Sequence, residues 1–417
     1  MNIAIVGAGI IGITTAWELA SDGHQVMVFE RRGAAAEETS FANAGVIAPG
    51  YVTPWAGPGM RMKALRSMMS THGAVKLRWP LRPREVGWIR RWQRACTLES
   101  YLANRTRLQR LAFYSRQRLQ EISEARELGF EGSEGYLVLL RGQRESRLAQ
   151  PGLDVLRQAG TAFREIDADE ARRIEPSLSS DTELTGAIHL PEDGVANCRQ
   201  FALLLKREAE ALGVQFHFNC DIAPLARSAP RTLVLAAGSP PLAFDAVVVC
   251  AGVDSARLLR PLGLRIPLAA VYGHSISANI REPLNAPRSA VMDERYKVAI
   301  TRMGLRVRVA GGAELGGSPE VINPAALQTL FKVLHDWFPG AASLQDGVQQ
   351  WKGARPMLPD GPPLIGASGV PGVWLNLGHG SSGWALACGS ARVLADLMAG
   401  NEPGIDIEGL GIERLRS

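Results

Sequence analysis

The first thirty residues constrain the fold more than any other part of the chain. Residues 2–30 read NIAIVGAGIIGITTAWELASDGHQVMVFE, with Gly7, Gly9 and Gly12 as G-x-G-x-x-G directly after an apolar run. A strand buried on both faces, a glycine turn, a helix and a second strand (QVMVF) predict a dinucleotide-binding β-α-β unit. Gly7 permits the tight turn, Gly9 lets the backbone approach a pyrophosphate, and Gly12 lets the helix pack closely on the strand. Glu30 ends the second strand, where a carboxylate can accept hydrogen bonds from ribose hydroxyls.

The order of the remaining segments separates the possible dinucleotides. An acid at position 30 disfavours NADP but does not distinguish NAD from FAD. An irregular loop (38–59) follows, then a helical region over about 60–129 and strand-rich sequence. Sequence typical of a nucleotide-binding domain resumes near residue 195, and again at the C-terminal helix that follows Gly378. A nucleotide domain interrupted by an inserted sheet fits FAD, which spans the whole molecule, and fits NAD poorly.

We therefore predict an α/β fold with α+β elements. It comprises a discontinuous, Rossmann-like FAD-binding domain, an inserted mixed β-sheet substrate domain and a helical basic segment. The length of 417 residues exceeds one ordinary core, which favours two domains. The predicted boundaries are 1–59, 192–262 and 350–417 for the FAD-binding domain, and 60–191 and 263–349 for the basic segment and substrate domain.

The composition is that of a globular, cytoplasmic protein. Hydrophobic residues make up 46% and charged residues 21%, and no apolar run approaches the roughly 20 residues that cross a bilayer. The first predicted strand begins at Asn2, so we expect no signal peptide. The five cysteines are scattered and never spaced as CxxC, so we expect reduced thiols and no metal site; they are Cys96, Cys198, Cys220, Cys250 and Cys388.

The positive charge is concentrated in residues 60–95. Ten basic residues and one acid, Glu85, give this segment +9, whereas the whole chain carries +5. Trp88 and Trp92 are four residues apart and share a helix face, and several methionines lie nearby. Such a pattern is typical of an interfacial helix on anionic lipid. A solvated basic face with a Trp-rich packing side, or RNA binding, would produce the same pattern.

Five longer motifs carry a family resemblance. They are GAGIIG with Glu30, TSFANAGVIAPGY..PWAGPG, DERYKVAITR, GARPMLPDGPPLIG and LNLGHGSSGWALACGSARVLADL. With these motifs the sequence resembles the D-amino-acid dehydrogenase family, within the D-amino-acid oxidase-like flavoproteins. The motifs run from the first residues to about residue 400, so the resemblance covers nearly the whole chain.

The resemblance implies oxidation of the Cα–N bond of an amino acid. A hydride passes from Cα to flavin N5, and hydrolysis of the imine gives a 2-oxo acid and ammonia. Relatives place an arginine at Arg355, where a planar guanidinium matches the substrate carboxylate. Tyr296 is a candidate for the same carboxylate, although packing in a sheet would also explain a tyrosine there. His379 is a candidate beside the flavin or a structural histidine.

The remaining site predictions concern the cofactor and the substrate pocket. Some covalently flavinylated relatives attach FAD within the segment that corresponds to GARPMLPDG, and this chain has no cysteine there, so the resemblance implies noncovalent FAD. Substrate-pocket candidates are Tyr51, Trp55, Tyr272 and His274; relatives commonly carry Lys-Gly-Tyr near residue 272, where this chain has Tyr-Gly-His. The predicted FAD-binding residues are Gly7, Gly9, Ile10, Ile11, Gly12, Glu30, Arg31, Thr39, Ser40, Asn43, Ala44, Gly45, Ile222, Ala251, Gly252, Gly378, Gly380, Ser381, Ser382 and Gly383.

Four functions remain open at this stage. The leading hypothesis is a D-amino-acid dehydrogenase that passes electrons to a membrane quinone or another electron-transfer acceptor, with residues 60–95 on the inner face of the membrane and no nucleic-acid partner. Other enzymes that fit are a dehydrogenase for D-proline or D-hydroxyproline and a soluble oxygen-using D-amino-acid or glycine oxidase. A non-catalytic flavin- or RNA-binding module is the alternative from another class.

Overall fold

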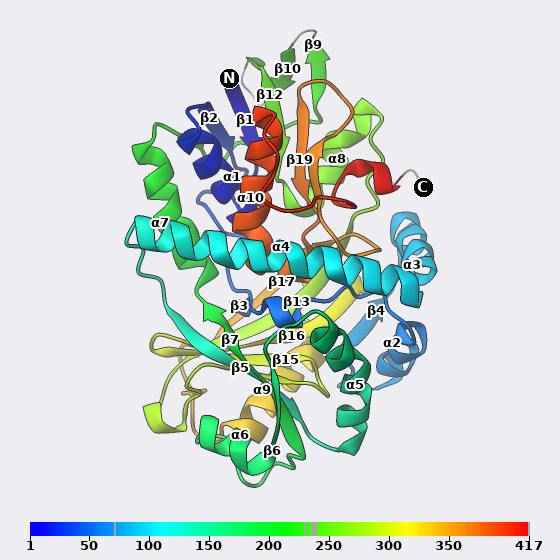
Figure 1. Cartoon of the computed structure of the whole chain (residues 1–417), viewed down its shortest axis with the longest axis vertical. Coiled ribbons are helices and arrows are strands. Elements are labelled where there is room, and N and C mark those ends of the chain that lie inside the picture. The colour runs from blue at the N-terminus through cyan, green and yellow to red at the C-terminus, as the bar shows by residue number, and fades with distance from the viewer. Residues whose placement is uncertain (71, 229–230, 235–239, 416–417) are drawn as a thin grey trace.

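A computed structural model describes residues 1–70, 72–228, 231–234 and 240–415. The chain forms two halves, each built on a β-sheet, with the long helix α4 (Leu98–Ala125) lying across their junction (Figure 1). This arrangement confirms the predicted α/β fold with an inserted mixed sheet. None of the described helices has an apolar stretch long enough to cross a membrane.

The first sheet contains the predicted β-α-β unit. Parallel pairing joins β1 to both β2 and β12, with Ile5 opposite Val28 and Val248. Only β18 runs antiparallel, beside β19. The order is β18 (Leu364–Ala367), β19 (Val373–Leu377), β12 (Ala246–Val249), β1 (Asn2–Val6), β2 (Gln25–Phe29) and β8 (Gln215–His217). A small antiparallel ribbon lies beyond it: β9 (Ala226–Ser228), β10 (Arg231–Val234) and β11 (Leu242–Phe244).

Helices distant in sequence cover this sheet. On one face α1 (Ile10–Ser21) packs against α7 (Cys198–Ala211) and α10 (Gly383–Ala399), and α10 also packs against α4. These helices contribute to one apolar core with β1, β2 and β12. Leu258 and Leu259 of α8 (Ser255–Leu259) join the core on the other face. Segments from both ends of the chain therefore build a single nucleotide-binding half.

The second sheet is larger and mixed. Helix α9 (Pro324–Trp337) packs on one face, and α5 (Gln143–Gln158) contributes to a core on the other. Helix α6 (Ala168–Ile174) packs beside β6 and β7. Along the main path the strands are β17 (Gln349–Met357), β13 (Ala269–Asn279), β16 (Arg306–Gly316), β15 (Val298–Met303), β14 (Ala290–Asp293), β5 (Gly132–Leu140), β7 (Gly186–Ala196) and β3 (Val46–Ile47); β4 (Val75–Arg78) pairs with β16, and β6 (Arg164–Asp167) pairs with β7.

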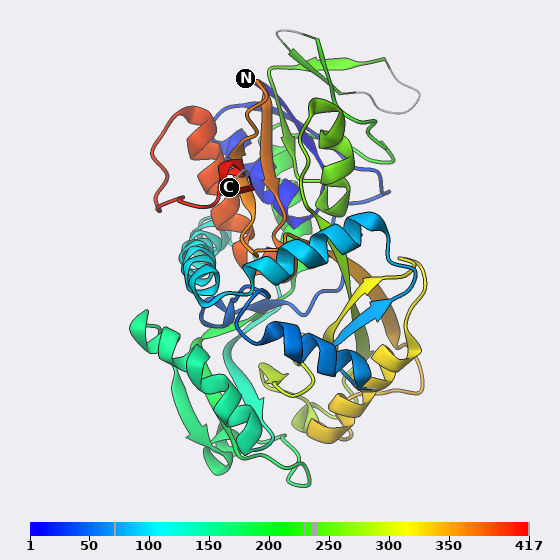
Figure 2. The same cartoon turned by 90° about the vertical axis from the view of Figure 1, so that its right-hand side faces the viewer.

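The basic segment differs from the continuous helical region expected over 60–129. It forms α2 (Met60–Met69), the strand β4 and α3 (Pro83–Ala95), which lie together at the junction of the two halves (Figure 2). β4 pairs in parallel with β16, because its alternating VKLR pattern can place one face of the strand on the sheet. Helix periodicity in its neighbours concealed this short strand.

Two strands belong to the larger sheet although the predicted domain boundaries place them in the FAD-binding domain. Apart from its first residue, Gln349, β17 lies within the segment assigned to the FAD-binding domain, yet it pairs with β13 in the larger sheet. β3 lies inside the first predicted nucleotide segment and pairs with β7 of the larger sheet. The chain therefore crosses between halves within the loop 38–59 and again after Met357.

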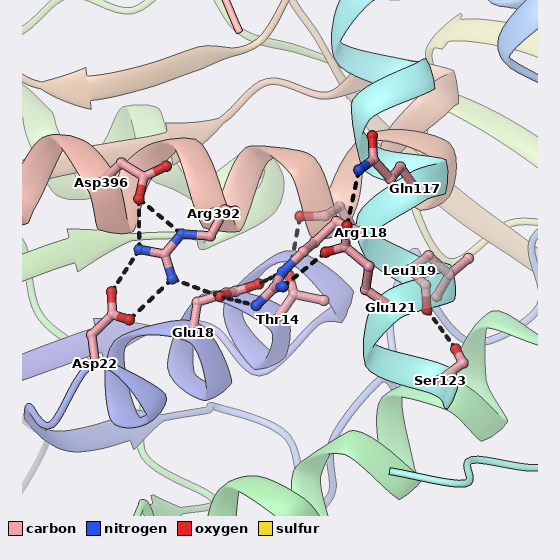
Figure 3. A network of polar contacts seen from close by, with 11 residues as sticks. Thr14, Glu18, Asp22, Gln117, Arg118, Leu119, Glu121, Ser123, Arg392 and Asp396 are labelled. Atoms are coloured by element: carbon pink, nitrogen blue, oxygen red, sulfur yellow. Dashed lines mark hydrogen bonds and ion pairs between the residues drawn. The ribbon is translucent and has the colours of Figure 1, made fainter. Parts of the chain in front are cut away.

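A buried carboxylate ties together three helices of the nucleotide-binding half. Glu18 on α1 is fully buried and accepts hydrogen bonds from Arg118 Nε and Nη2 at 2.7 and 3.0 Å (Figure 3). Arg392 Nη1 on α10 donates to the same carboxylate at 2.9 Å and pairs with Asp22 and Asp396. One residue of the first helix thus bonds to residues 100 and 374 positions later in the chain.

We predict that Glu18→Gln lowers the free energy of unfolding by roughly 2–3 kcal/mol. Breaking a buried ion pair typically costs about 3–5 kcal/mol, and we place this case lower because the Arg118 and Arg392 side chains are 23% and 14% exposed. Urea unfolding would measure the change. The control is Glu121→Gln, which removes the surface partner of Arg118 and should cost under about 1 kcal/mol. Equal losses in the two variants would contradict this role for Glu18.

Candidate functional site

A single large cavity of about 1590 Å³ is lined by both halves of the molecule. Its lining includes the glycine turn after β1, the loop 38–59, the strands β13 and β17, and the start of α10. Helices α2, α4 and α5 contribute residues to its walls. A cavity at such a junction is the default place for a cofactor and a substrate to meet.

The glycine turn has the geometry that the sequence pattern predicts. Gly7 has φ +109° and donates its N–H to Phe29 O at 2.8 Å. A Cβ at Gly12 would lie 1.8 Å from Gly7 O, so Gly12 serves packing and does not line the cavity. At Gly9 the nearest heavy atom to such a Cβ would be Ser40 Oγ, at 3.4 Å. Gly9 therefore leaves open the space that a pyrophosphate would need.

Glu30 lies beside this turn with its carboxylate oriented by backbone amides. Ala8 N–H and Arg32 N–H donate to its two oxygens at 2.8 and 2.9 Å. Glu30 also lines the cavity, so its remaining acceptor capacity faces a bound ligand. Arg31 lines the cavity as well, but Glu38 and Asp254 neutralise its guanidinium.

Two helix N-termini point their positive ends at the cavity. Helix α1 begins at Ile10, whose N–H donates to Ser40 Oγ at 3.0 Å. Helix α10 begins at Gly383 and has no side-chain cap, while Ser381 and Ser382 line the cavity just before it. Free N–H groups and the helix dipoles favour electron-rich groups at both places. The glycine cradle, Glu30 and these helix ends fit a dinucleotide such as FAD.

The loop 38–59 is bound to the larger sheet. Thr39 Oγ1 donates to Ala354 O at 2.6 Å, and Arg308 Nη1 donates to Asn43 O at 3.0 Å. The Asn43 side chain accepts from Gly45 N–H at 3.0 Å, so part of its hydrogen-bonding capacity is used within the loop. These bonds hold the loop along the cavity wall even without a ligand.

Arg355 on β17 lines the cavity and has no acidic partner among the described residues. Its Nη1 donates to Gly312 O at 2.7 Å, and a Cβ at Gly273 would lie 2.5 Å from its Nη2. Burial lowers the pKa of Arg355 to about 10, so the side chain is still a cation at neutral pH. A cation held this way, over a glycine and facing a cavity, is suited to an anionic ligand.

The other two predicted catalytic residues also line the cavity, but both have structural partners. Tyr296 donates its backbone N–H to Asp293 Oδ1 at 3.1 Å, and its ring faces the Arg141 guanidinium at 5.1 Å. His379 Nε2 lies 3.0 Å from Ser390 Oγ. Burial lowers the pKa of His379 to about 3, so its imidazole is neutral at physiological pH.

Three of the four substrate-pocket candidates line the cavity, and Tyr272 does not. Tyr51, Trp55 and His274 are cavity residues, and burial lowers the pKa of His274 to about 4. The Tyr272 ring instead lies 4.5 Å from Lys352 Nζ. The register between β13 and β16 shifts between residues 272 and 274, because β16 contributes one more residue than β13 at this point.

The structure brings the predicted cofactor residues together at the cavity, with one exception. Gly12 packs against the turn, as described above. The predicted cofactor residues that line the cavity are Gly7, Gly9, Ile10, Ile11, Glu30, Arg31, Thr39, Ser40, Asn43, Ala44, Gly45, Ile222, Ala251, Gly252, Gly378, Gly380, Ser381, Ser382 and Gly383.

Sequence reasoning missed a partly buried polar triad in the cavity wall. Tyr51 Oη donates to Glu294 Oε2 at 2.7 Å, and Lys297 Nζ lies 2.9 Å from the same hydroxyl and pairs with Glu294. Burial, with a contribution from Glu294, raises the pKa of Tyr51 well above its usual value. The motif DERYKVAITR contains both charged members, but their pairing with a tyrosine 243 residues earlier has no local signal. Arg105 on α4 was missed for the same reason.

Comparison with known proteins places this cavity in context. A family model described as FAD dependent oxidoreductase matches residues 2–397. A D-amino acid dehydrogenase of Cereibacter sphaeroides is 42% identical over 416 residues, covering 99% of this chain and 95% of that protein. Another from Bradyrhizobium diazoefficiens is 40% identical and covers 99% of both chains. The crystal structure of glycine oxidase from Geobacillus kaustophilus has TM-score 0.76 and 21% identity, covering 99% and 98%; it supports the fold alone.

We predict opposite failures for two alanine variants in the glycine turn. Gly9→Ala should leave the apoprotein stable, because its Cβ meets nothing closer than 3.4 Å, but should weaken FAD binding about tenfold or more. Gly12→Ala should destabilise the apoprotein itself, because its Cβ would lie 1.8 Å from Gly7 O. Flavin titration and thermal unfolding of both apoproteins would separate the effects. Equal FAD affinity in Gly9→Ala and wild type would contradict the assignment.

Proposed function

Since this chain belongs to the FAD-dependent oxidoreductase family, we propose that it oxidises D-amino acids to 2-oxo acids and ammonia. The names of its two D-amino acid dehydrogenase relatives support this substrate class. The single observation that carries the proposal is Arg355, a half-buried cation that lines the cavity and has no acidic partner among the described residues. The α-carboxylate of an amino acid supplies the missing negative charge.

In this proposal Arg355 positions the substrate, and the neutral His379 avoids placing a second positive charge near the substrate amine. Arg355 would bind the α-carboxylate through the guanidinium nitrogens that Gly312 O leaves free. His379 is neutral, so it adds no positive charge beside the substrate amine, and its low pKa makes it a poor proton acceptor. We therefore assign it a structural role with Ser390. The amine reaches the site unprotonated or loses its proton to solvent.

Bound FAD would supply the two-electron chemistry, accepting a hydride from the substrate Cα at N5. One water then hydrolyses the imine, so the products are one 2-oxo acid, one ammonia and the reduced acceptor. We propose that FAD is held noncovalently by the glycine turn, Glu30, the loop 38–59 and the start of α10. Acid precipitation, which should release all the flavin into the supernatant, tests this point.

We further propose that electrons leave to a quinone or another acceptor other than oxygen, with the protein peripheral on the inner face of the cell membrane. Exposed apolar side chains on α2 and before α3 support this surface: Met62 is 53%, Leu65 51% and Trp79 79% exposed. Trp88 does not belong to it, because it is buried, donates from Nε1 to Met357 O at 2.9 Å and stacks on Trp92. The two tryptophans share a face, but that face packs inward.

Anaerobic flavin bleaching with D- and L-amino acids, D-proline and D-hydroxyproline tests the reaction. Reduction by D-amino acids and reoxidation by a soluble quinone analogue are the expected results. Full-rate hydrogen peroxide production in air would instead support an oxidase. Bleaching only by the cyclic imino acids would support that narrower dehydrogenase, and no bleaching with any compound would favour a binding module.

Arg355→Met should raise the KM for D-amino acids by about 10²-fold, because a charge-assisted pair with the substrate carboxylate is lost. Flavin content should not change. Arg355→Lys keeps the charge without the planar geometry, so its KM should lie between those of the wild type and Arg355→Met. Arg302→Met, on β15 outside the cavity lining, is the matched control and should resemble wild type. An unchanged KM in Arg355→Met would show that the carboxylate binds elsewhere.

The membrane surface predicts binding to anionic vesicles. Wild-type protein should cosediment with vesicles that contain anionic lipid, less at high salt, and poorly with neutral vesicles. The triple variant Met62→Ser, Leu65→Ser, Trp79→Ser should bind several-fold more weakly, because apolar area is lost from the interface. Leu284→Ser removes a leucine that is 84% exposed elsewhere and should bind like wild type. Equal binding to neutral and anionic vesicles would contradict the electrostatic part of the proposal.

A further inference from the structure

The cavity walls formed by α2, α4, α5 and the larger sheet with its β14–β15 turn carry an excess of positive charge. Lys297 is paired with Glu294, and Arg295 with Glu145. Arg355 is assigned above to the α-carboxylate. Among the described residues, these walls contain Arg66, Arg105, Arg144, Arg147, Arg295, Lys297 and Arg355, with Glu294 as the carboxylate. The proposed reaction therefore leaves several cations without a role.

Arg105 is the buried one among these remaining cations. Its residue surface is 2% exposed, and its Nη1 donates to Tyr101 Oη at 2.9 Å. Its Nε is buried without a hydrogen-bond partner, and within the described chain its guanidinium donates to the Tyr101 hydroxyl and not to a carboxylate. The Arg105 guanidinium carbon also lies 5.9 Å from the centroid of the Tyr101 ring. This contact helps to hold the side chain in place but does not neutralise its charge. A buried cation with an unpaired N–H is costly unless a ligand completes it.

Arg105 lies in the cavity wall beside α5. Both Arg105 and Tyr101 line the cavity, as does Gly152 on α5. A Cβ at Gly152 would still lie 3.7 Å from Arg105 Nη1, so α5 approaches the guanidinium without a side chain at this point. Arg144 and Arg147, also on α5, line the cavity and are exposed, and their charge raises the local concentration of anions.

We propose that Arg105 and Tyr101 form a second anion-binding subsite, so that the preferred substrates are D-amino acids with an acidic side chain, of the D-glutamate and D-aspartate class. This inference rests on the proposed function, in which Arg355 binds the α-carboxylate. The distal carboxylate accepts hydrogen bonds from the Arg105 guanidinium and supplies the counter-charge that the described chain lacks there. Arg105 is then a specificity-determining residue that touches the substrate.

Equilibrium binding of two amine-free probes tests the subsite in the full-length, FAD-loaded protein. Perturbation of the flavin absorbance would give the affinity for glutarate, which has two carboxylates, and for butyrate, which has one. Wild type should bind glutarate about tenfold or more tightly than butyrate, the usual scale for a charge-assisted hydrogen bond. Equal affinities in wild type would overturn the proposal, and this comparison needs no variant.

Variants on one helix locate the preference. Arg105→Met should lose the glutarate preference and leave butyrate binding unchanged. Arg107→Met removes the same charge from α4, but its partner is Glu408 and it does not line the cavity, so the preference should stay. Tyr101→Phe keeps the ring, so it should weaken the binding of glutarate but not the binding of butyrate. It is a milder variant that can be used if Arg105→Met does not fold. A preference that survives in both Arg105→Met and Tyr101→Phe would overturn the subsite.

Flavin reduction separates failure of the subsite from failure of the proposed function. D-Glutamate should reduce the flavin with a lower KM than D-glutamine, and Arg105→Met should abolish this difference. Equal KM values for the two compounds would overturn the subsite and leave the D-amino-acid dehydrogenase function intact. Failure of every D-amino acid to reduce the flavin would overturn the proposed function, while the glutarate comparison would still report on the subsite.

Discussion

The carboxylate of Glu18 is the constraint on which the nucleotide-binding half depends. It is fully buried, and it joins α1, α4 and α10 through Arg118 and Arg392. Because α1 and α10 both begin at the cavity, their relative position sets the distance between two positive helix ends. One end lies at the glycine turn and the other beside Arg355's strand. A single dinucleotide can contact both ends only while this packing holds.

The loop 38–59 is irregular because it has to serve both sheets. Its β3 pairs with β7 in the larger sheet, while Ser40 bonds to the first residue of α1 in the other half. No regular element can satisfy hydrogen bonds in two sheets and also present backbone to a cavity. Small residues and short turns meet that requirement, and bonds to Ala354 and from Arg308 fix the result. What resembles a linker in the sequence is a structural connection between the cofactor side and the substrate side.

Local patterns predicted the β-α-β unit, the interrupted nucleotide domain and nearly all glycines at the cavity. These features depend on residues close in sequence, where periodicity and turn chemistry decide the conformation. The misplaced features depend on long-range packing. β4 needs β16 to become a strand, and Tyr272 lies outside the cavity lining at the point where the register between β13 and β16 shifts. Arg105 in α4 looks like any exposed helical arginine until the fold shows that α5 covers it.

The distribution of counter-charges divides the cavity into two chemical regions. At the nucleotide end Arg31 is neutralised by Glu38 and Asp254, so a bound phosphate relies on backbone N–H groups and helix dipoles. At the substrate end Arg355 and Arg105 have no carboxylate partner in the described chain. Leaving a buried cation unpaired costs stability, and the buried Arg141 is paired with Asp293 and Asp336. In the proposed function, a D-amino acid with an acidic side chain would supply one carboxylate to Arg355 and one to Arg105.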